Sequence, residues 1–388
     1  MIEQRENDVS RMRLAIICDY LEEDWPSMDL CAQMLLKHLQ SEHSECIQAV
    51  PICPTFKRRF QHIPGLGKKR VAFNGDRLLN RFWDYPRYLS PQVADFDWFH
   101  VSDHTYAQLV HVLPPERTGV FCHDLDAFRS LIEPEQDPRP AWYKAMSRRI
   151  LHGLQKAAVV FCSTAQVREQ IDHYGFLKQS RLVQAPYGIS PEFSITPLHS
   201  SSTNEQVLEQ IGEAPFVLHV GSNIPRKRID VLLDVFAALQ IKHPDLRLVK
   251  VSGDWTQTQQ EQITRLGINN SIIHFTGLER TTIAALYRRA SVVLLTSEAE
   301  GFGLPVIEAL ACGAIVAVSD IPVLREVGGS AAVYCPVADV AAWVETVERL
   351  LESPNTAPEL NRRLAQAQKY SWSTHAQMIA KAYLQLAG

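Results

Sequence analysis

Short, uniformly apolar segments rich in β-branched residues alternate with amphipathic segments along nearly the whole chain. Residues 215–221 (PFVLHVG) and 290–297 (ASVVLLTS) are typical of the apolar kind, and residues 228–242 (RIDVLLDVFAALQIK) of the amphipathic kind. Apolar strands separated by helices indicate parallel sheets that are covered on both faces. The fold class is therefore α/β. The segments that we expect to form strands are 14–20, 45–52, 98–102, 118–123, 157–163, 181–186, 215–221, 246–253, 271–277, 290–297, 314–320 and 331–336.

The alternation stops once, at residues 186–206 (PYGISPEFSITPLHSSSTNEQ), which are rich in Pro, Ser and Thr. This composition is typical of a linker, and 388 residues suffice for two or three domains of about 150 residues each. We therefore expect a Rossmann-like domain over 1–190, a second one over 206–372, and a final helix over 373–388. One side of that helix is apolar and needs a surface to cover, which we expect the N-terminal domain to provide.

Charge, apolar runs and cysteines exclude several classes of protein. The formal net charge of −4 gives no reason to expect nucleic acid as a partner. Residues 14–18 (LAIIC) are too few for a signal sequence or a membrane span, and no later apolar run approaches about 18 residues, so we expect a cytoplasmic protein. The eight cysteines include no CxxC pair, which predicts buried thiols and no zinc site.

Two glutamates bracket a tight turn. Glu300 and Glu308 stand eight positions apart across GFGLPVI, where Gly301 and Gly303 favour a turn and Pro305 favours the start of a helix. We expect the strand VVLLTS, then a loop, then a helix with Glu308 in its first turn. Neither carboxylate lies on the apolar face of a strand or helix, so we expect replacement of either one to leave the protein folded.

This layout favours a phosphate-bearing ligand. Doubly wound sheets bind ligands at the carboxyl ends of their strands, and the free amides of a helix N-terminus attract phosphate. Residues 219–236 (HVGSNIPRKRIDVLLDVF) repeat the layout, with Arg226 and Lys227 at a helix start, where basic groups oppose the dipole and need an anion. We interpret the two segments as a sugar-nucleotide site. The alternatives are a capping carboxylate and a solvated basic face.

Long stretches of the C-terminal half resemble a known enzyme family. The stretches VGSNIPRKRIDVLLDVF, FTGLERTTIAALYRRASVVLLTSEAEGFGLPVIEALACGAIVAVSDIPVLREVGG and YSW are similar to family-four retaining glycosyltransferases, including their E-x7-E motif at Glu300 and Glu308. In the N-terminal half, VFCHDLDAF, VVFCSTAQVREQI and VQAPYGISPEF resemble the family more loosely. The resemblance implies the GT-B fold, in which two doubly wound Rossmann-like domains face a central cleft and the C-terminal helix crosses back to the N-terminal domain.

The resemblance also implies roles for single residues. Glu308 would bind the ribose hydroxyls, Glu300 the donor sugar, and Arg226 and Lys227 the leaving phosphates, while His123 would lie across the cleft near the transferred sugar. The catalytic set is thus His123, Arg226, Lys227 and Glu300. The donor-binding set is Gly221, Ser222, Gly277, Leu278, Glu300, Gly301, Phe302, Gly303, Leu304 and Glu308.

One loop departs from the family pattern, and one triplet resembles a metal-binding motif of a different fold. Many members have a glycine pair after the first strand, whereas this chain has EEDWPSMD at 22–29, which we interpret as serving the acceptor through Trp25. Asp124-Leu125-Asp126 is a DxD triplet, which holds a metal in another glycosyltransferase fold. Here the triplet follows His123 in the acceptor half, and we expect no metal and no cofactor.

Residues 57–87 carry nine basic residues against two acidic ones, with five Phe and Trp residues at 56–83 interleaved. A solvated basic face is one interpretation. The other is an anionic partner, either a phospholipid surface or a phosphate-bearing lipid acceptor. The residues that we assign to this acceptor or membrane contact are Trp25, Arg58, Arg59, Lys68 and Lys69.

We therefore expect a metal-independent, retaining hexosyltransferase of polysaccharide or glycolipid biosynthesis. It would use a UDP- or GDP-sugar and a glycan or lipid-linked acceptor, in the cytoplasm or peripherally at the inner face of the membrane. The alternatives are a sugar-nucleotide epimerase or a phosphorylase on the same fold, and a non-catalytic sugar-nucleotide sensor. An NAD dehydrogenase is disfavoured because no GxGxxG follows LAIICDY.

Overall fold

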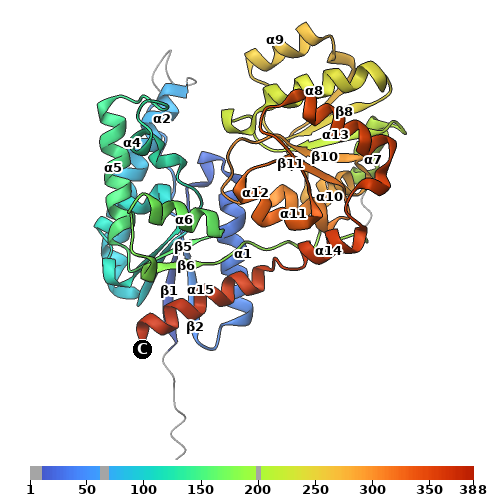
Figure 1. Ribbon diagram of the computed structural model, residues 1–388. Coiled ribbons are helices and arrows are strands. Elements are labelled where there is room, and N and C mark those ends of the chain that lie inside the picture. Colours follow the sequence, from blue (N-terminus) through green and yellow to red (C-terminus); the bar gives the residue numbers. More distant parts are fainter. Residues whose placement is uncertain (1–10, 62–69, 198–201) are drawn as a thin grey trace, which may run out of the picture. The chain divides into compact units, whose positions relative to one another are not determined.

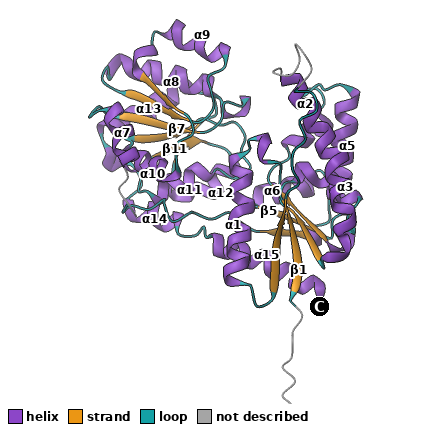
Figure 2. Cartoon of the chain, turned by 180° about the vertical axis from the view of Figure 1, so that it is seen from behind, coloured by secondary structure: helices purple, strands orange, loops and turns teal. Residues whose placement is uncertain are grey.

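The computed structural model describes residues 11–61, 70–197 and 202–388 (Figure 1). It divides into an N-terminal unit, Met1–Pro186 with Trp372–Gly388, and a C-terminal unit, Tyr187–Ser371. Each unit contains a six-stranded parallel sheet with helices on both faces (Figure 2). A strand overlaps each of the predicted segments, although β1 begins two residues before its segment, and the predicted α/β class with two Rossmann-like domains is confirmed.

The N-terminal sheet has the strand order β2-β1-β3-β4-β5-β6. Every residue of β3, β4 and β5 is buried, as expected for strands covered on both faces. The direction of winding reverses between β1 and β3, so ligands of this unit are expected at the carboxyl ends of those strands. The strands are β1 (Met12–Ile17), β2 (Ile47–Ile52), β3 (Trp98–Val101), β4 (Thr118–Cys122), β5 (Val159–Cys162) and β6 (Leu182–Gln184). The helices are α1 (Pro26–Glu42), α2 (Arg70–Leu79), α3 (Tyr85–Leu89), α4 (Arg129–Ile132), α5 (Ala141–Lys156), α6 (Ala165–His173) and α15 (Trp372–Ala387).

The C-terminal helix α15 belongs to the N-terminal unit and packs against α1 and β6 (Figure 1). Its Tyr383 is fully buried, and the hydroxyl lies 2.9 Å from Nδ1 of His100 on β3. Gly119 on β4 makes room for this contact, because a Cβ there would overlap the Tyr383 hydroxyl. His375 Nδ1 lies 3.0 Å from the carbonyl oxygen of Ala185. The helix is therefore an integral part of the N-terminal fold.

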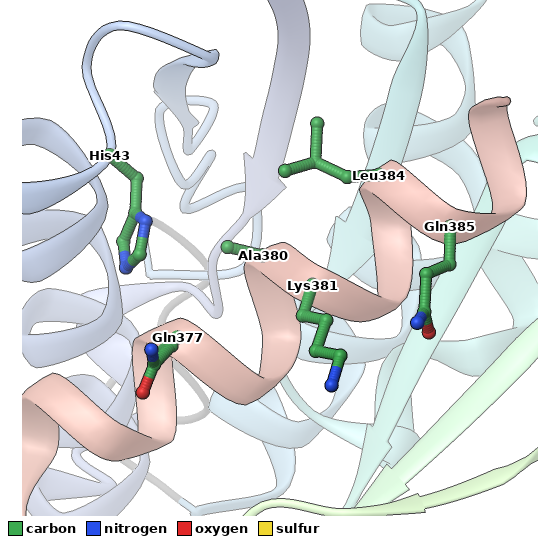
Figure 3. Close-up of a pocket in the computed structure, with 6 residues that line it drawn as sticks. All are labelled: His43, Gln377, Ala380, Lys381, Leu384 and Gln385. Atoms are coloured by element: carbon green, nitrogen blue, oxygen red, sulfur yellow. The ribbon is translucent and has the colours of Figure 1, made fainter.

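A surface pocket of about 390 Å³ lies where α15 passes the end of α1 (Figure 3). Its lining combines amide, amine and aliphatic side chains and includes none of the predicted site residues. The lining residues are His43, Gln377, Ala380, Lys381, Leu384 and Gln385.

The C-terminal sheet has the strand order β12-β11-β10-β7-β8-β9. Here the winding reverses between β7 and β10, which places the switch point of this unit at their carboxyl ends. The strands are β7 (Phe216–Val220), β8 (Arg247–Val251), β9 (Ile272–Phe275), β10 (Val292–Leu295), β11 (Val316–Ser319) and β12 (Val333–Cys335). The helices are α7 (Ser202–Ile211), α8 (Ile229–Lys242), α9 (Gln257–Leu266), α10 (Arg280–Arg289), α11 (Leu304–Ala311), α12 (Pro322–Gly328), α13 (Val340–Glu352) and α14 (Leu360–Ala367).

Candidate functional site

The C-terminal sheet brings three of the predicted residues together at its switch point. Arg226 and Lys227 lie in the short 3₁₀ helix η8 (Pro225–Lys227) that follows β7, and Glu300 follows β10. β7 and β10 are parallel neighbours, so the residues beyond their carboxyl ends meet at one edge of the sheet. This is the edge at which doubly wound sheets bind ligands.

The carboxylate of Glu300 is held by a lysine, an arginine and a hydroxyl group. Lys227 Nζ lies 2.6 Å from Oε1 and 2.8 Å from Oε2, and Ser297 Oγ donates to Oε1 over 2.7 Å. Arg226 Nη1 lies 3.5 Å from Oε2. Burial would raise the pKa of Glu300, but Lys227 and Arg226 outweigh it and hold this pKa below the ordinary value. Glu300 is therefore ionised at neutral pH.

Glu300 lies on a loop, yet its side chain is largely buried. Its side chain is only 4% exposed, because the loop after β10 folds inward over Lys227. Its removal would leave a largely buried ammonium group without its counter-ion, and buried charges are costly unless they are paired.

Backbone contacts fix the basic turn against β10. Thr296 Oγ1 lies 3.0 Å from the carbonyl oxygens of both Lys227 and Arg228. The amide of Glu298 donates to the carbonyl oxygen of Arg226 over 2.8 Å. Arg228 has a φ of 48°, in the left-handed region that non-glycine residues rarely adopt, and this turns the chain from η8 into α8. The position of Lys227 is thus set by the loop that also carries Glu300.

The glycine turn differs in detail from the expectation. Gly303 has a φ of 96° and immediately precedes α11, which starts at Leu304. Pro305 is therefore the second helical residue and Glu308 the fifth, so the expected place in the first turn is wrong: Glu308 begins the second turn. The ring of Phe302 is buried in the unit, with its centroid 5.0 Å from that of Tyr187 and 5.4 Å from that of Tyr370. Within the first turn of α11, Pro305 has no N–H and the amide of Val306 donates to the carbonyl oxygen of Gly303 over 2.9 Å. The amides predicted to meet an anion are those of Phe302, Gly303 and Leu304, which precede these two residues.

Glu308 is buried beside α10 and has a different environment from Glu300. Arg280 Nη2 lies 3.7 Å from Oε1, and the Tyr287 hydroxyl donates to Oε2 over 3.4 Å. Burial raises the pKa of Glu308 to about 7, against the opposing influence of Arg280 and Tyr287, and Glu192 raises it further. The carboxyl group is thus close to half ionised at neutral pH.

The other predicted donor residues lie on three loops of the same unit. The amide of Gly221 donates to the carbonyl oxygen of Val251 over 3.1 Å, so this amide is committed to the sheet. Ser222 is exposed, and Gly301 is half-buried. Gly277 and Leu278 follow β9, which is separated from β7 by β8. That places them two strands away from the basic turn.

The sequence analysis missed three residues of this region. Ser297 binds Glu300, and Arg280 and Glu192 surround Glu308. A signal for Arg280 was present: it is a basic residue at the first position of α10, where it opposes the helix dipole just as Arg226 and Lys227 do. No local pattern marks Ser297 or Glu192.

His123 follows β4 in the N-terminal unit and is buried. Its Nε2 lies 2.8 Å from the carbonyl oxygen of Ser102, and its ring lies 5.0 Å from that of Phe121. Burial lowers the pKa of His123 to about 4, although Asp103 opposes this shift. The imidazole is therefore neutral at physiological pH, and its role beside the transferred sugar stays a prediction.

The DxD triplet forms a local turn, because Asp124 Oδ1 accepts the amide of Asp126 over 3.0 Å. Within residues 11–61, 70–197 and 202–388, His, Cys, Asp and Glu side chains do not gather in groups of three that could hold a metal ion. Independence from metals stays a prediction.

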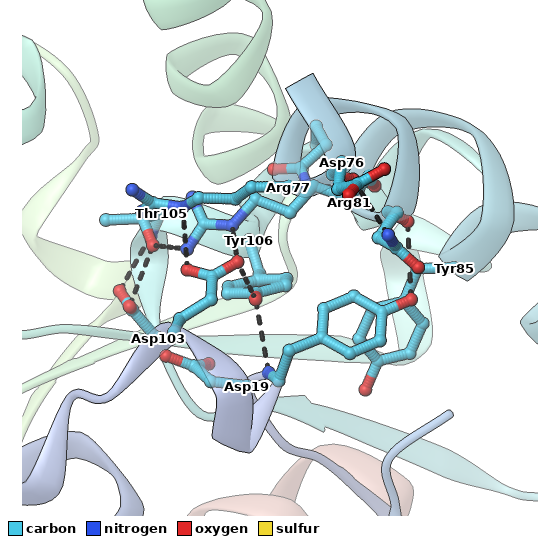
Figure 4. Close-up of polar contacts among 12 residues, drawn as sticks. Asp19, Asp76, Arg77, Arg81, Tyr85, Asp103, Thr105 and Tyr106 are labelled. Atoms are coloured by element: carbon cyan, nitrogen blue, oxygen red, sulfur yellow. Dashed lines mark hydrogen bonds and ion pairs between the residues drawn. The ribbon is translucent and has the colours of Figure 1, made fainter. Parts of the chain in front are cut away.

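A charged network fills the switch point of the N-terminal unit (Figure 4). Glu23 Oε1 accepts from Arg81 Nε over 2.7 Å and from the Tyr106 hydroxyl over 2.8 Å. Asp19 follows β1 and faces Asp103, which follows β3. Burial, and then the charge of Asp103, raise the pKa of Asp19 well above its ordinary value. The two acids share this edge only if Asp19 carries a proton.

Four of the nine basic residues of the segment are paired inside its own unit. The pairs are Arg77 and Arg81 with Glu23, and Lys57 and Arg59 with Asp84. Arg58, Arg70 and Arg87 are exposed, and Trp25 is 40% exposed. The predicted Lys68 and Lys69 lie outside the described residues. The structure thus gives Arg59 a partner that the sequence analysis did not foresee.

Comparisons with known proteins identify similar glycosyltransferases. Residues 200–370 match the family described as glycosyl transferases group 1. The chain is 28% identical over 285 residues to the serotype-specific mannosyltransferase WbdA of Escherichia coli, an alignment that covers 70% of the chain and 34% of WbdA. The chain thus spans about a third of the length of that relative.

Solved structures share the fold. The chain matches HepE of Anabaena in complex with UDP-glucose with a TM-score of 0.72 at 16% identity, covering 97% of the chain and 100% of HepE. It matches WaaG, a glycosyltransferase involved in lipopolysaccharide biosynthesis, with a TM-score of 0.71 at 15% identity, covering 95% and 99%. In the described part of the chain, no helix is both long and apolar enough to cross a bilayer.

Proposed function

We propose that this chain transfers a hexose from a nucleoside diphosphate sugar to a glycan or lipid-linked acceptor, with retention of anomeric configuration, and the match of residues 200–370 to the glycosyl transferases group 1 supports this proposal. The observation that carries the proposal is the contact of Lys227 and Arg226 with the buried carboxylate of Glu300 at the switch point of the C-terminal unit. The relative WbdA is a mannosyltransferase, and the structural neighbour HepE is known in complex with UDP-glucose. GDP-mannose and UDP-glucose are therefore the first donors to test.

Lys227 and Arg226 stabilise the leaving diphosphate in this proposal. An ammonium group has three N–H donors, and two of those of Lys227 contact Glu300, which leaves one directed to a phosphate oxygen. Glu300 fixes the lysine in place before the donor arrives, so little reorganisation is needed when charge develops on the leaving oxygen. The amides of residues 302–304 add a second set of donors.

Glu308 accepts hydrogen bonds from the ribose hydroxyls, and the N-terminal unit binds the acceptor. None of the residues assigned to the site is placed as an enzymatic nucleophile. The leaving phosphate would therefore take the proton of the acceptor hydroxyl as the new glycosidic bond forms on the same face of the sugar.

The test is to incubate donor with and without acceptor and to determine the product by NMR. A glycoside with the anomeric configuration of the donor is expected. An isomerised nucleotide sugar formed without acceptor would instead identify an epimerase, and binding without turnover would identify a sensor.

Metal independence is tested in the same assay. Full activity is expected after treatment with EDTA, because cationic side chains and amides meet the phosphates. Loss of activity that Mn²⁺ or Mg²⁺ restores would mean that this prediction is wrong and that Asp124 and Asp126 are candidate metal ligands.

A further inference from the structure

Three charged side chains from three separate segments meet beside the proposed ribose site. Arg280, the first residue of α10, lies with Nη2 3.7 Å from Oε1 of Glu308 on α11. Its Nε lies 3.7 Å from Oε1 of Glu192, which belongs to the segment before α7. The guanidinium carbon lies 5.0 Å from the ring centroid of Phe193. One arginine thus stands between two carboxyl groups and above an aromatic ring.

Neither of these ion pairs is a hydrogen bond. Both distances exceed the 2.7–3.2 Å typical of an N–H···O contact, and Arg280 Nε and Glu192 Oε2 are buried without a hydrogen-bond partner. Unused donors and acceptors of this kind are costly inside a protein. Arg280 is therefore held to both carboxyl groups by charge and not by hydrogen bonds.

The charge of Glu308 depends on the balance between its neighbours. Arg280 favours the carboxylate and Glu192 opposes it, while burial favours the neutral acid. Tyr287 of α10 and Cys312 at the end of α11 also face this carboxyl group. A carboxylate accepts hydrogen bonds from two vicinal hydroxyls, whereas a protonated carboxyl offers one acceptor fewer and weaker bonds.

We propose that Arg280 is a positioning residue of the donor site, which holds the carboxylate of Glu308 ionised and oriented for the ribose, and that Glu192 limits this effect by competing for the same guanidinium. The proposal rests on the proposed function, in which Glu308 binds the ribose hydroxyls. Arg280 acts through Glu308 and needs no contact with the donor itself.

The test measures the affinity of the full chain for UDP and GDP by calorimetry between pH 6 and 8.5, in wild type, Arg280→Gln, Arg280→Lys and Glu192→Gln. If Arg280→Gln moves the midpoint of ionisation of Glu308 from pH 7 to 8, affinity falls about fivefold at pH 7 and much less at pH 8.5. Glu192→Gln should shift the pH profile the opposite way, and Arg280→Lys should restore most of the affinity. The matched control is Arg289→Gln, which removes an arginine of the same helix that contacts α7 and the residue after it; its profile should equal that of wild type.

The 2′,3′-dideoxynucleoside diphosphates separate this inference from the proposed function. Wild type should bind them more weakly than UDP or GDP, and the penalty of Arg280→Gln should disappear with them. A penalty that persists without ribose hydroxyls, or that is equal at every pH, would mean that Arg280 has only a structural role. If wild type binds dideoxy and ordinary nucleotides equally well, or binds neither, the ribose role of Glu308 is wrong and the proposal fails with it.

Discussion

At the residue scale, two buried glutamates eight positions apart have opposite surroundings. Glu300 meets the ammonium group of Lys227 at hydrogen-bond distance, which more than offsets its burial. Glu308 meets Arg280 only at 3.7 Å, and burial prevails. The ion pair of Glu308 is about 1 Å longer than that of Glu300, and Coulombic attraction falls with distance. This difference contributes to keeping Glu300 ionised, whereas the charge of Glu308 responds to pH.

The difference predicts distinct kinetic defects. Glu300→Ala should raise the activation free energy by on the order of 3 kcal/mol and so lower kcat roughly 100-fold. The reason is that the change releases Lys227 from the position at which charge develops. Glu308→Ala should mainly raise the donor KM, because donor binding loses roughly 1.5–3 kcal/mol. The value of kcat should change little, because the contacts to the ribose do not change during the reaction. Steady-state kinetics with varied donor measure both. This assignment of roles is wrong if Glu308→Ala has a lower kcat at unchanged donor KM while Glu300→Ala has only a lower affinity for the donor.

A stability measurement gives an independent check on Glu308. Because its folded-state pKa of about 7 lies above the ordinary 4.5, the stabilisation from the neutral carboxyl is complete below pH 4.5 and is lost as pH rises through 7. Glu308→Gln stays neutral throughout. It should match wild type at pH 4 and exceed it at pH 8 by up to roughly 3 kcal/mol. Urea unfolding at the two pH values measures this, and a difference that does not change with pH would contradict it.

At the element scale, the basic segment predicts a weak and salt-sensitive attraction to anionic membranes. Val71 and Trp83 are exposed by 68% and 56%, and the guanidinium of Arg87 lies 3.2 Å from the ring centroid of Trp83. Each basic residue near such a surface contributes about 1 kcal/mol. Arg58→Glu with Arg70→Glu should therefore abolish co-sedimentation with phosphatidylserine vesicles at low salt.

The control for this experiment is Arg59→Gln, whose side chain donates to Asp84 Oδ1 over 2.7 Å. It should lower the melting temperature and leave sedimentation nearly unchanged, because this charge is already paired. If wild type does not sediment at low salt, the membrane interpretation of the segment is wrong.

The elements themselves were the most predictable part of the molecule. A strand covered on both faces must be apolar throughout, so a local pattern such as VVLL at 292–295 is sufficient evidence for β10. The meeting of Lys227 with Glu300 also follows from sequence, because the residues after neighbouring parallel strands share an edge. The contacts of Arg280 with Glu192 and Glu308 do not follow, since they join three segments whose packing no local pattern encodes.

The same reason explains why the pairing of the basic segment was not predicted. Its charge was counted along the sequence, whereas one of its counter-ions, Glu23, lies more than 50 residues away and is fully buried between Arg77 and Arg81. Excess charge in a segment indicates an external anion only when the fold does not supply an internal one.

At the scale of the whole molecule, one unit is formed by a single continuous stretch of the chain and the other by two separate stretches. The C-terminal unit is one stretch, Tyr187–Ser371, and contains every donor residue proposed above. The N-terminal unit needs α15 from the other end of the chain. Trp372, His375, Ile379 and Tyr383 of that helix are each at most 2% exposed.

This difference predicts that only one unit folds alone. Burying a large apolar side chain contributes about 1.5–3 kcal/mol, so the loss of Trp372, Ile379 and Tyr383 from the N-terminal unit is comparable to the whole 5–15 kcal/mol of a typical domain. A fragment of residues 187–371 should unfold cooperatively and bind nucleoside diphosphate, whereas a fragment of residues 1–186 should be unfolded or aggregated. A peptide of residues 372–388, added during refolding, should restore ordered circular dichroism to the latter, and the same peptide with Tyr383→Ala should restore much less. Cooperative unfolding of residues 1–186 without the peptide would show that α15 is dispensable to that unit.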